Sequence, residues 1–103
     1  GCPPGVYRLG SSELKLSEDG SVRLIGSGRL AGSALRIDRA LENLMRFSGV
    51  SLAEALKTVT VNPARVMGLQ GRQEFLVPGE LADLVLLRYI SETRDIEVIE
   101  VVT

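Results

Sequence analysis

The sequence predicts an α+β fold, because two amphipathic helical patterns lie at its centre, a β-hairpin pattern precedes them and two strand-like apolar runs follow them. The central part covers residues 33–68 and contains two helices, a break at 48–51 and a third, Pro-containing helical turn. A chain of 103 residues amounts to one domain at most. Its core must therefore be modest.

The first helix is predicted by apolar residues at helical spacing, which share one face: Ile37, Ala40, Leu41, Leu44 and Met45. Asp38 and Glu42 belong to the opposite, polar face, and we expect Glu42 to pair with Arg46 on the exposed side. Ser33 is the expected N-cap. Gly49 is placed to adopt the left-handed conformation that ends the helix.

The second helix begins with a capping-box pattern, in which Ser51 and Glu54 each satisfy a backbone N–H of the first turn. We expect its buried side to consist of Leu52, Ala55, Leu56 and Val59. Asn62 and Pro63 then fit the N-cap and first residue of a third helical turn, which Gly68 ends.

Strand patterns stand on both sides of the helices. Residues 13–16 and 21–25 alternate apolar and polar positions around 18–20, which predicts a β-hairpin with a Gly-containing turn. Residues 84–87 form a continuous apolar run, typical of a strand buried on both faces, and a final strand is expected at 96–102. So few strands predict unpaired edges that something outside the chain, or another copy, covers.

Composition excludes several classes of function. A formal net charge of −1 leaves no basic field for nucleic acid or an anionic membrane, and no apolar run approaches the roughly 20 residues that span a bilayer. The chain has no His and only one Cys, Cys2, which excludes His-based catalytic triads and nearly all zinc sites and suits a reducing cytoplasm. Because the chain carries neither an initiator Met nor a signal-peptide pattern, we expect it to be a piece of something longer.

Two places could carry chemistry. Residues 26–33 are rich in Gly and are expected to form a loop, whose free N–H groups at the start of the first helix would suit an anion. A flexible connector that caps the helix explains the same pattern, since the Lys-Ser/Thr ending of a P-loop is missing. Among the scattered carboxylates, Asp83 lies beside the apolar run, where either a metal site or a turn-capping role fits.

Several short motifs occur together in the second half: Asn62-Pro63-Ala64-Arg65, Gly68-Leu69, Gly71-Arg72, Pro78-Gly79 and Ala82-Asp83-Leu84-Val85. Together they resemble the closing section of the amidohydrolase superfamily. In the first half the motifs are Pro3-Pro4-Gly5-Val6-Tyr7-Arg8-Leu9-Gly10, Asp19-Gly20 and Leu30-Ala31-Gly32-Ser33-Ala34-Leu35. With these, nearly the whole chain resembles the N-acetylglucosamine-6-phosphate deacetylase family.

This resemblance implies that residues 1–68 form the end of a TIM-barrel domain, with a hairpin excursion and the last helices, and that 69–103 belong to a small β-sandwich domain. It implies an enzyme that releases acetate from N-acetylglucosamine 6-phosphate and leaves glucosamine 6-phosphate. In that family a divalent metal, zinc or a similar ion, activates the attacking water. The resemblance further implies that Leu30, Ala31, Gly32 and Ser33 contact the substrate.

The metal ligands and the proton-shuttling Asp of that family would lie upstream of Gly1. We therefore expect this chain to be the C-terminal part of a cytoplasmic deacetylase, with no catalytic residue, no metal ligand and no activity of its own. Glu74 and Glu80 depart from the family, which has Gly and Lys there.

Two alternatives stay open. One is a non-catalytic interaction or oligomerisation module, whose apolar first-helix stripe binds a partner or a second copy. The other is a fragment of a different amidohydrolase. Both for such a module and for the deacetylase fragment, exposed apolar faces predict a homo-oligomer or a swapped dimer.

Overall fold

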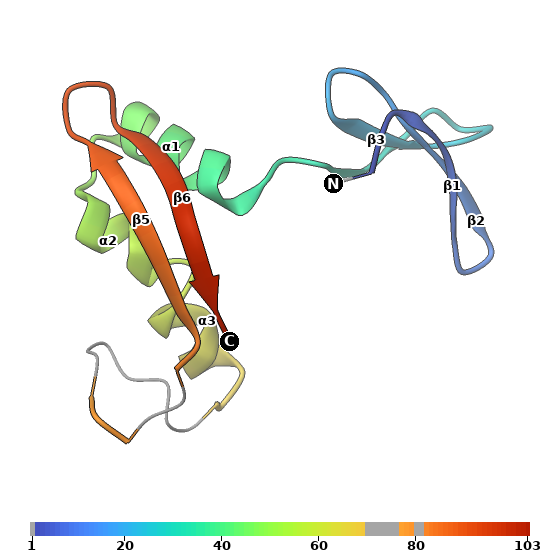
Figure 1. The fold of residues 1–103 in the computed structure, drawn as a ribbon. Helices are drawn as coiled ribbons and strands as arrows, with labels where there is room; N and C mark the ends of the chain where they lie inside the picture. The colour runs from blue at the N-terminus through green and yellow to red at the C-terminus, as the bar shows by residue number, and fades with distance from the viewer. Residues whose placement is uncertain (1, 70–76, 80–81) are drawn as a thin grey trace. The chain divides into compact units, whose positions relative to one another are not determined.

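The computed structural model describes residues 2–69, 77–79 and 82–103, and the chain divides into two compact units (Figure 1). Unit 1 is Gly1–Arg36 and unit 2 is Ile37–Thr103. Unit 1 contains strands, whereas unit 2 combines helices with a second sheet, so the mixed α+β class is confirmed. Glu74, Glu80 and the Gly71-Arg72 motif lie outside the described residues. The barrel-end and sandwich assignments stay predictions.

Unit 1 is a four-stranded antiparallel sheet in the order β1-β2-β3-β4. Its strands are β1 (Gly5–Leu9), β2 (Ser12–Leu16), β3 (Ser21–Leu24) and β4 (Leu30–Ser33). The predicted hairpin is confirmed as β2 and β3. Its turn needs the φ of +79° that Gly20 adopts, and Asp19 Oδ1 accepts a hydrogen bond of 2.9 Å from the Ser21 N–H.

The expected loop at residues 26–33 is wrong in its second half. Leu30–Ser33 is a strand, β4, which pairs with β3. Ser33 is not a helix N-cap either, because the first helix begins four residues later, at Ile37, and the Ser33 hydroxyl accepts a 3.1 Å hydrogen bond from the Leu35 N–H. The glycines and the absence of apolar alternation concealed this strand, whose pairing depends on β3.

Unit 2 packs two helices on a two-stranded antiparallel sheet (Figure 1). Its elements are α1 (Ile37–Ser48), α2 (Leu52–Lys57), α3 (Val61–Val66), β5 (Leu84–Ile90) and β6 (Asp95–Val102). The buried core joins both helices to β6 and consists of Leu41, Met45, Ala55 and Ile96. The expected inner side of α2 is confirmed, because Ala55 is buried and Leu52, Leu56 and Val59 pack against this core.

Local sequence signals fix most helix ends of unit 2. Ser51 and Glu54 form the predicted capping box, and Gly49 follows α1 with a φ of +77°. The predicted start of the third helix is wrong by two residues, since Thr60 is the N-cap and Val61 the first helical residue. Proline is tolerated throughout the first turn, where N–H groups have no intrahelical acceptor, so Pro63 does not mark the first position.

The predicted apolar face of helix α1 is confirmed only in part, and Leu44 packs against the core as expected. Leu41 and Met45 are buried as predicted, but Ile37 keeps 64% of its surface exposed. Two carboxylates assigned to the polar face are buried instead: Glu42 is 1% exposed and Asp38 is 9% exposed. The helix is therefore turned so that part of its polar side faces the unit's interior.

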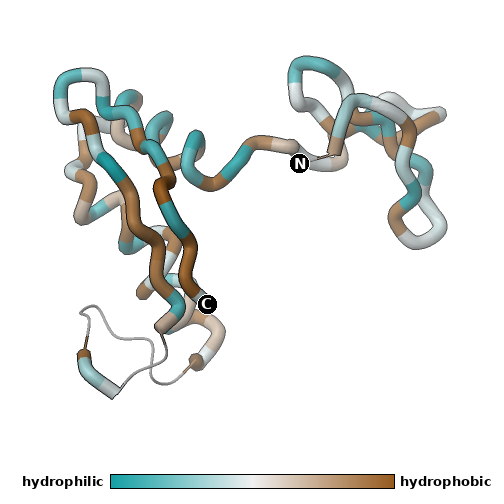
Figure 2. Tube along the Cα trace, viewed as in Figure 1, coloured by the Kyte–Doolittle hydropathy of each residue, from teal (hydrophilic) through white to brown (hydrophobic). Residues whose placement is uncertain are grey.

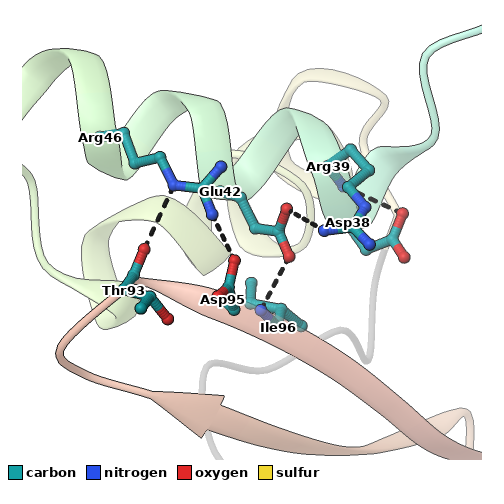
Figure 3. A network of polar contacts seen from close by, with 7 residues as sticks. All are labelled: Asp38, Arg39, Glu42, Arg46, Thr93, Asp95 and Ile96. Atoms are coloured by element: carbon teal, nitrogen blue, oxygen red, sulfur yellow. Dashed lines mark hydrogen bonds and ion pairs between the residues drawn. The ribbon is translucent and has the colours of Figure 1, made fainter.

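Polar contacts between α1 and the β5–β6 hairpin explain this orientation (Figure 3). Glu42 accepts a 2.9 Å hydrogen bond from the Ile96 N–H and a 2.7 Å ion-pair contact from Arg39. Arg46 pairs with Asp95 and donates to the Thr93 carbonyl oxygen at 3.2 Å. The expected Glu42–Arg46 pair is therefore wrong, because Arg46 reaches the hairpin instead.

These contacts also set the ionisation of Glu42. Burial by itself would raise the pKa of Glu42, but hydrogen bonds from the Ile96 N–H and from Arg39, with the charges of Arg39 and Arg46, hold that pKa below its ordinary value. Glu42 consequently stays ionised in the folded protein at neutral pH.

The β5–β6 ribbon is less covered than its sequence indicates. Leu84, Val85 and Leu86 keep 37%, 54% and 57% of their surfaces exposed, so the prediction of a strand buried on both faces is wrong. Among the described residues of unit 2, the half of the ribbon near its turn packs on the core, through Leu87, Tyr89 and Ile96. Figure 2 shows how strongly apolar both strands are.

Replacing Glu42 with Ala should lower the free energy of unfolding of unit 2 by about 1 to 3 kcal/mol, because the buried Ile96 N–H loses its acceptor. Urea unfolding followed by far-ultraviolet circular dichroism measures this change. The matched control is Glu97→Ala, which removes an exposed 2.7 Å pair with Arg88 and should cost less than about 1 kcal/mol.

The same contribution depends on pH with a defined sign. Because folding lowers the pKa of Glu42, its stabilisation is complete above the ordinary pKa of the unfolded chain and is lost as the pH falls through the lower pKa of the folded protein. Between pH 7 and pH 3, the free energy of unfolding measured with urea should therefore fall further for the natural chain than for Glu42→Gln. Equal losses would contradict this role for Glu42.

Candidate functional site

The four residues predicted to contact a substrate form one element, β4, at an edge of the unit 1 sheet. All four are exposed. The structure therefore brings Leu30, Ala31, Gly32 and Ser33 together, but on a strand and not in a loop at a helix start. A helix-end anion site at this place is not supported by the fold.

The pairing of β4 with β3 is interrupted at its centre. Ser33 lies opposite Ser21 and Gly32 opposite Val22, whereas Leu30 lies opposite Arg23. Ala31 is thus an extra residue without a partner on β3, which makes a β-bulge. Bulges occur often next to binding sites, because they redirect the chain and release main-chain groups from the ladder.

A methyl group would fit at Gly32 without a clash. A Cβ built on Gly32 would meet only the Val22 Cβ, at 4.0 Å, which is ordinary van der Waals contact. The backbone of Gly32 is not in the left-handed region either. Neither packing within unit 1 nor backbone conformation therefore requires a glycine at this position.

The polar groups around β4 are few and exposed. The Arg23 guanidinium donates a 3.0 Å hydrogen bond to the Gly28 carbonyl oxygen, in the turn that leads to β4. Hydrogen bonds from the side chain and N–H of Ser21 hold the pKa of Asp19 below its ordinary value. The Asp19 carboxylate is therefore already hydrogen-bonded within the turn between β2 and β3. Sequence analysis missed Arg23, although a charged residue between Val22 and Leu24 was the available signal.

The residues that the structure describes contain no group of three or more His, Cys, Asp and Glu side chains arranged to hold a metal ion. Asp83 is exposed and immediately precedes β5. In this same part of the chain no helix is long and apolar enough to cross a membrane.

Comparison with known proteins identifies the class to which this chain belongs. The family model described as "Amidohydrolase family" matches residues 14–103, which is most of the chain. The chain therefore belongs to the amidohydrolase family.

Its relatives are more specific. A protein of Escherichia coli (strain K12), provisionally named an N-acetylgalactosamine-6-phosphate deacetylase, is 39% identical over 87 residues, which cover 84% of this chain and 51% of that protein. The N-acetylgalactosamine-6-phosphate deacetylase of Escherichia coli O157:H7 is also 39% identical over 87 residues, 84% of this chain and 22% of that protein. The N-acetylglucosamine-6-phosphate deacetylase of Vibrio furnissii is 32% identical over 85 residues, 82% of this chain and 21% of that protein.

These relatives confirm the resemblance to amino-sugar-phosphate deacetylases. The matched part makes up half the length of the first relative and about a fifth of the length of the other two.

Gly32→Ala should leave the fold of unit 1 intact, because the added methyl group meets ordinary contact distances and alanine loses less conformational entropy on folding. Thermal unfolding of the 103-residue chain should show an unchanged or slightly higher midpoint. The matched control is Gly20→Ala, where φ is +79° and the substitution should cost about 1 kcal/mol or more. A large loss of stability in Gly32→Ala would show that unit 1 itself needs this glycine.

Proposed function

We propose that this chain is the C-terminal part of a cytoplasmic amidohydrolase that releases acetate from an N-acetylated hexosamine 6-phosphate. The observation that carries the proposal is the match over more than four-fifths of the chain to deacetylases named for such substrates. The resemblance of the motifs indicates the glucosamine compound, with glucosamine 6-phosphate as the product. Two relatives at 39% identity are named for the galactosamine compound, so both epimers belong in the test.

In this proposal β4 lies against the sugar. Because Gly32 has no side chain, a ligand could come close to the main chain there, and the bulge at Ala31 would offer peptide groups for hydrogen bonds to sugar hydroxyls. The Ser33 hydroxyl accepts from the Leu35 N–H, and its own hydrogen can be donated to a ligand. These groups bind and orient the substrate, and they supply no nucleophile or base.

The reacting groups belong elsewhere in the proposed enzyme. A divalent metal would supply the activated water, as in the deacetylase family that the chain resembles. The described residues of this chain do not form a suitable centre for such an ion. Following the family that the chain resembles, we assign the ligands of that ion to a longer protein that contains this segment.

The test is acetate release by that longer protein, with the N-acetylated 6-phosphates of glucosamine and galactosamine offered separately. We expect turnover of at least one epimer by the longer protein, and no turnover and no stoichiometric metal by elemental analysis for the 103-residue chain. In the longer protein, Gly32→Ala should lower kcat/KM by about tenfold or more, because a methyl group displaces the ligand from its position.

Inactivity of the longer protein on both epimers would contradict the proposal. Turnover by the isolated chain would contradict the assignment of the catalytic groups to other residues. Full activity of the Gly32→Ala variant would remove β4 from the substrate site.

A second candidate, a homo-oligomerisation or interaction module, is favoured by uncovered apolar side chains. Phe47 on α1 is 84% exposed, Ile37 is 64% exposed and Val101 on β6 is 60% exposed. Burying such side chains against a second copy would be favourable. We propose this association, including a swapped dimer, for the isolated chain.

Light scattering on the isolated chain tests this second candidate. A mass of twice 11.1 kDa that falls on substitution of Phe47 with Glu supports self-association through α1. The matched control is Arg65→Glu, an exposed position on α3. A monomeric mass over the micromolar range would contradict it.

A further inference from the structure

The residues of β4 make no buried contact that would fix the position of the bulge. Every side chain of β4 is exposed, so no buried residue fixes the register of the strand against β3. Gly-rich strands without a buried face are prone to slip by a residue. In β4 a slip of one residue would move the unpaired position away from Ala31.

The turn between β3 and β4 supplies the missing constraint. The Leu24 N–H donates to the Arg29 carbonyl oxygen at 2.9 Å, and the Gly28 N–H donates to the Leu24 carbonyl oxygen at 3.0 Å. Gly28 adopts a φ of +67°, which lets the chain reverse within these few residues. In a hairpin, the type and length of the turn determine the register of the strands that follow.

One side chain links this turn to the bulge. Arg23 lies opposite Leu30, directly beside the extra residue, and its guanidinium donates a 3.0 Å hydrogen bond to the Gly28 carbonyl oxygen. The main chain of Arg23 therefore borders the bulge while its side chain holds the turn. A charged donor on a carbonyl oxygen makes a stronger hydrogen bond than a neutral one does.

We infer that Arg23 is a positioning residue of the substrate site: by holding the β3–β4 turn, it keeps the bulged main chain at Ala31 in the register that meets the sugar. This inference rests on the proposed function. Arg23 acts through β4 and needs no contact with the substrate.

The experiment compares three variants of the longer protein in acetate release. Arg23→Met keeps the aliphatic part of the side chain and removes the donor, so KM should rise about two- to tenfold while kcat changes less than about twofold. Arg23→Lys restores a single donor and should recover part of the loss. Arg8→Met, at an exposed position of β1 in the same sheet, is the matched control and should leave KM unchanged.

Amide hydrogen exchange on the 103-residue chain provides a measurement without activity. In Arg23→Met, the Leu24 and Gly28 N–H groups of the turn should exchange faster, while those of β1 and β2 keep their natural rates. An unchanged thermal midpoint for the variant would show that unit 1 stays folded.

The outcomes separate this inference from the proposed function. If the natural longer protein hydrolyses neither epimer, the proposed function fails and this inference fails with it. If the natural protein is active and Arg23→Met has the natural KM, only the role of Arg23 is overturned. If Arg23→Met speeds amide exchange in the turn but leaves KM unchanged, the role of Arg23 is likewise overturned.

Discussion

The buried carboxylate of Glu42 is the constraint on which unit 2 depends. It is 1% exposed, and it accepts a hydrogen bond from the N–H of Ile96, a residue 54 positions further along the chain. A charge in that environment is tolerated only if its hydrogen bonds are made, which permits few relative positions of α1 and β6. Apolar contacts alone would allow the two elements to slide.

This constraint accounts for the side of α1 that faces inward. Leu41 and Met45 lie next to the carboxylate side of the helix and are buried. Ile37, at the start of the apolar stripe, and Phe47, outside that stripe, stay exposed. The helix thus carries more apolar surface than the described residues of unit 2 cover, which agrees with a rotation set by the buried polar contact.

The features that sequence analysis predicted correctly have their causes close together in the chain. The capping box joins Ser51 to Glu54, and the β2–β3 turn follows from Asp19 and Gly20. The features that it missed depend on partners far away. Burial of Glu42 follows from its hydrogen bond with the Ile96 N–H on β6, which no helical period reveals.

The candidate site shows the same division. That Leu30, Ala31, Gly32 and Ser33 belong together came from a motif, whereas their strand pairing and the bulge come from β3. Arg23 stood out in the sequence only as a charged residue between Val22 and Leu24, and its place beside the site follows from a hydrogen bond across the turn to Gly28.

The open end of the β5–β6 ribbon has a consequence for how such a chain survives in solution. Leu84 pairs with Val102 and Val85 with Val101, and side chains alternate along a strand, so apolar groups project from both faces there. Strands of this kind stack readily into insoluble fibrils, and acidic residues placed among them oppose that stacking by repulsion. Glu100, which lies opposite Leu86, interrupts the apolar run of β6 at this end, and its charge opposes such stacking.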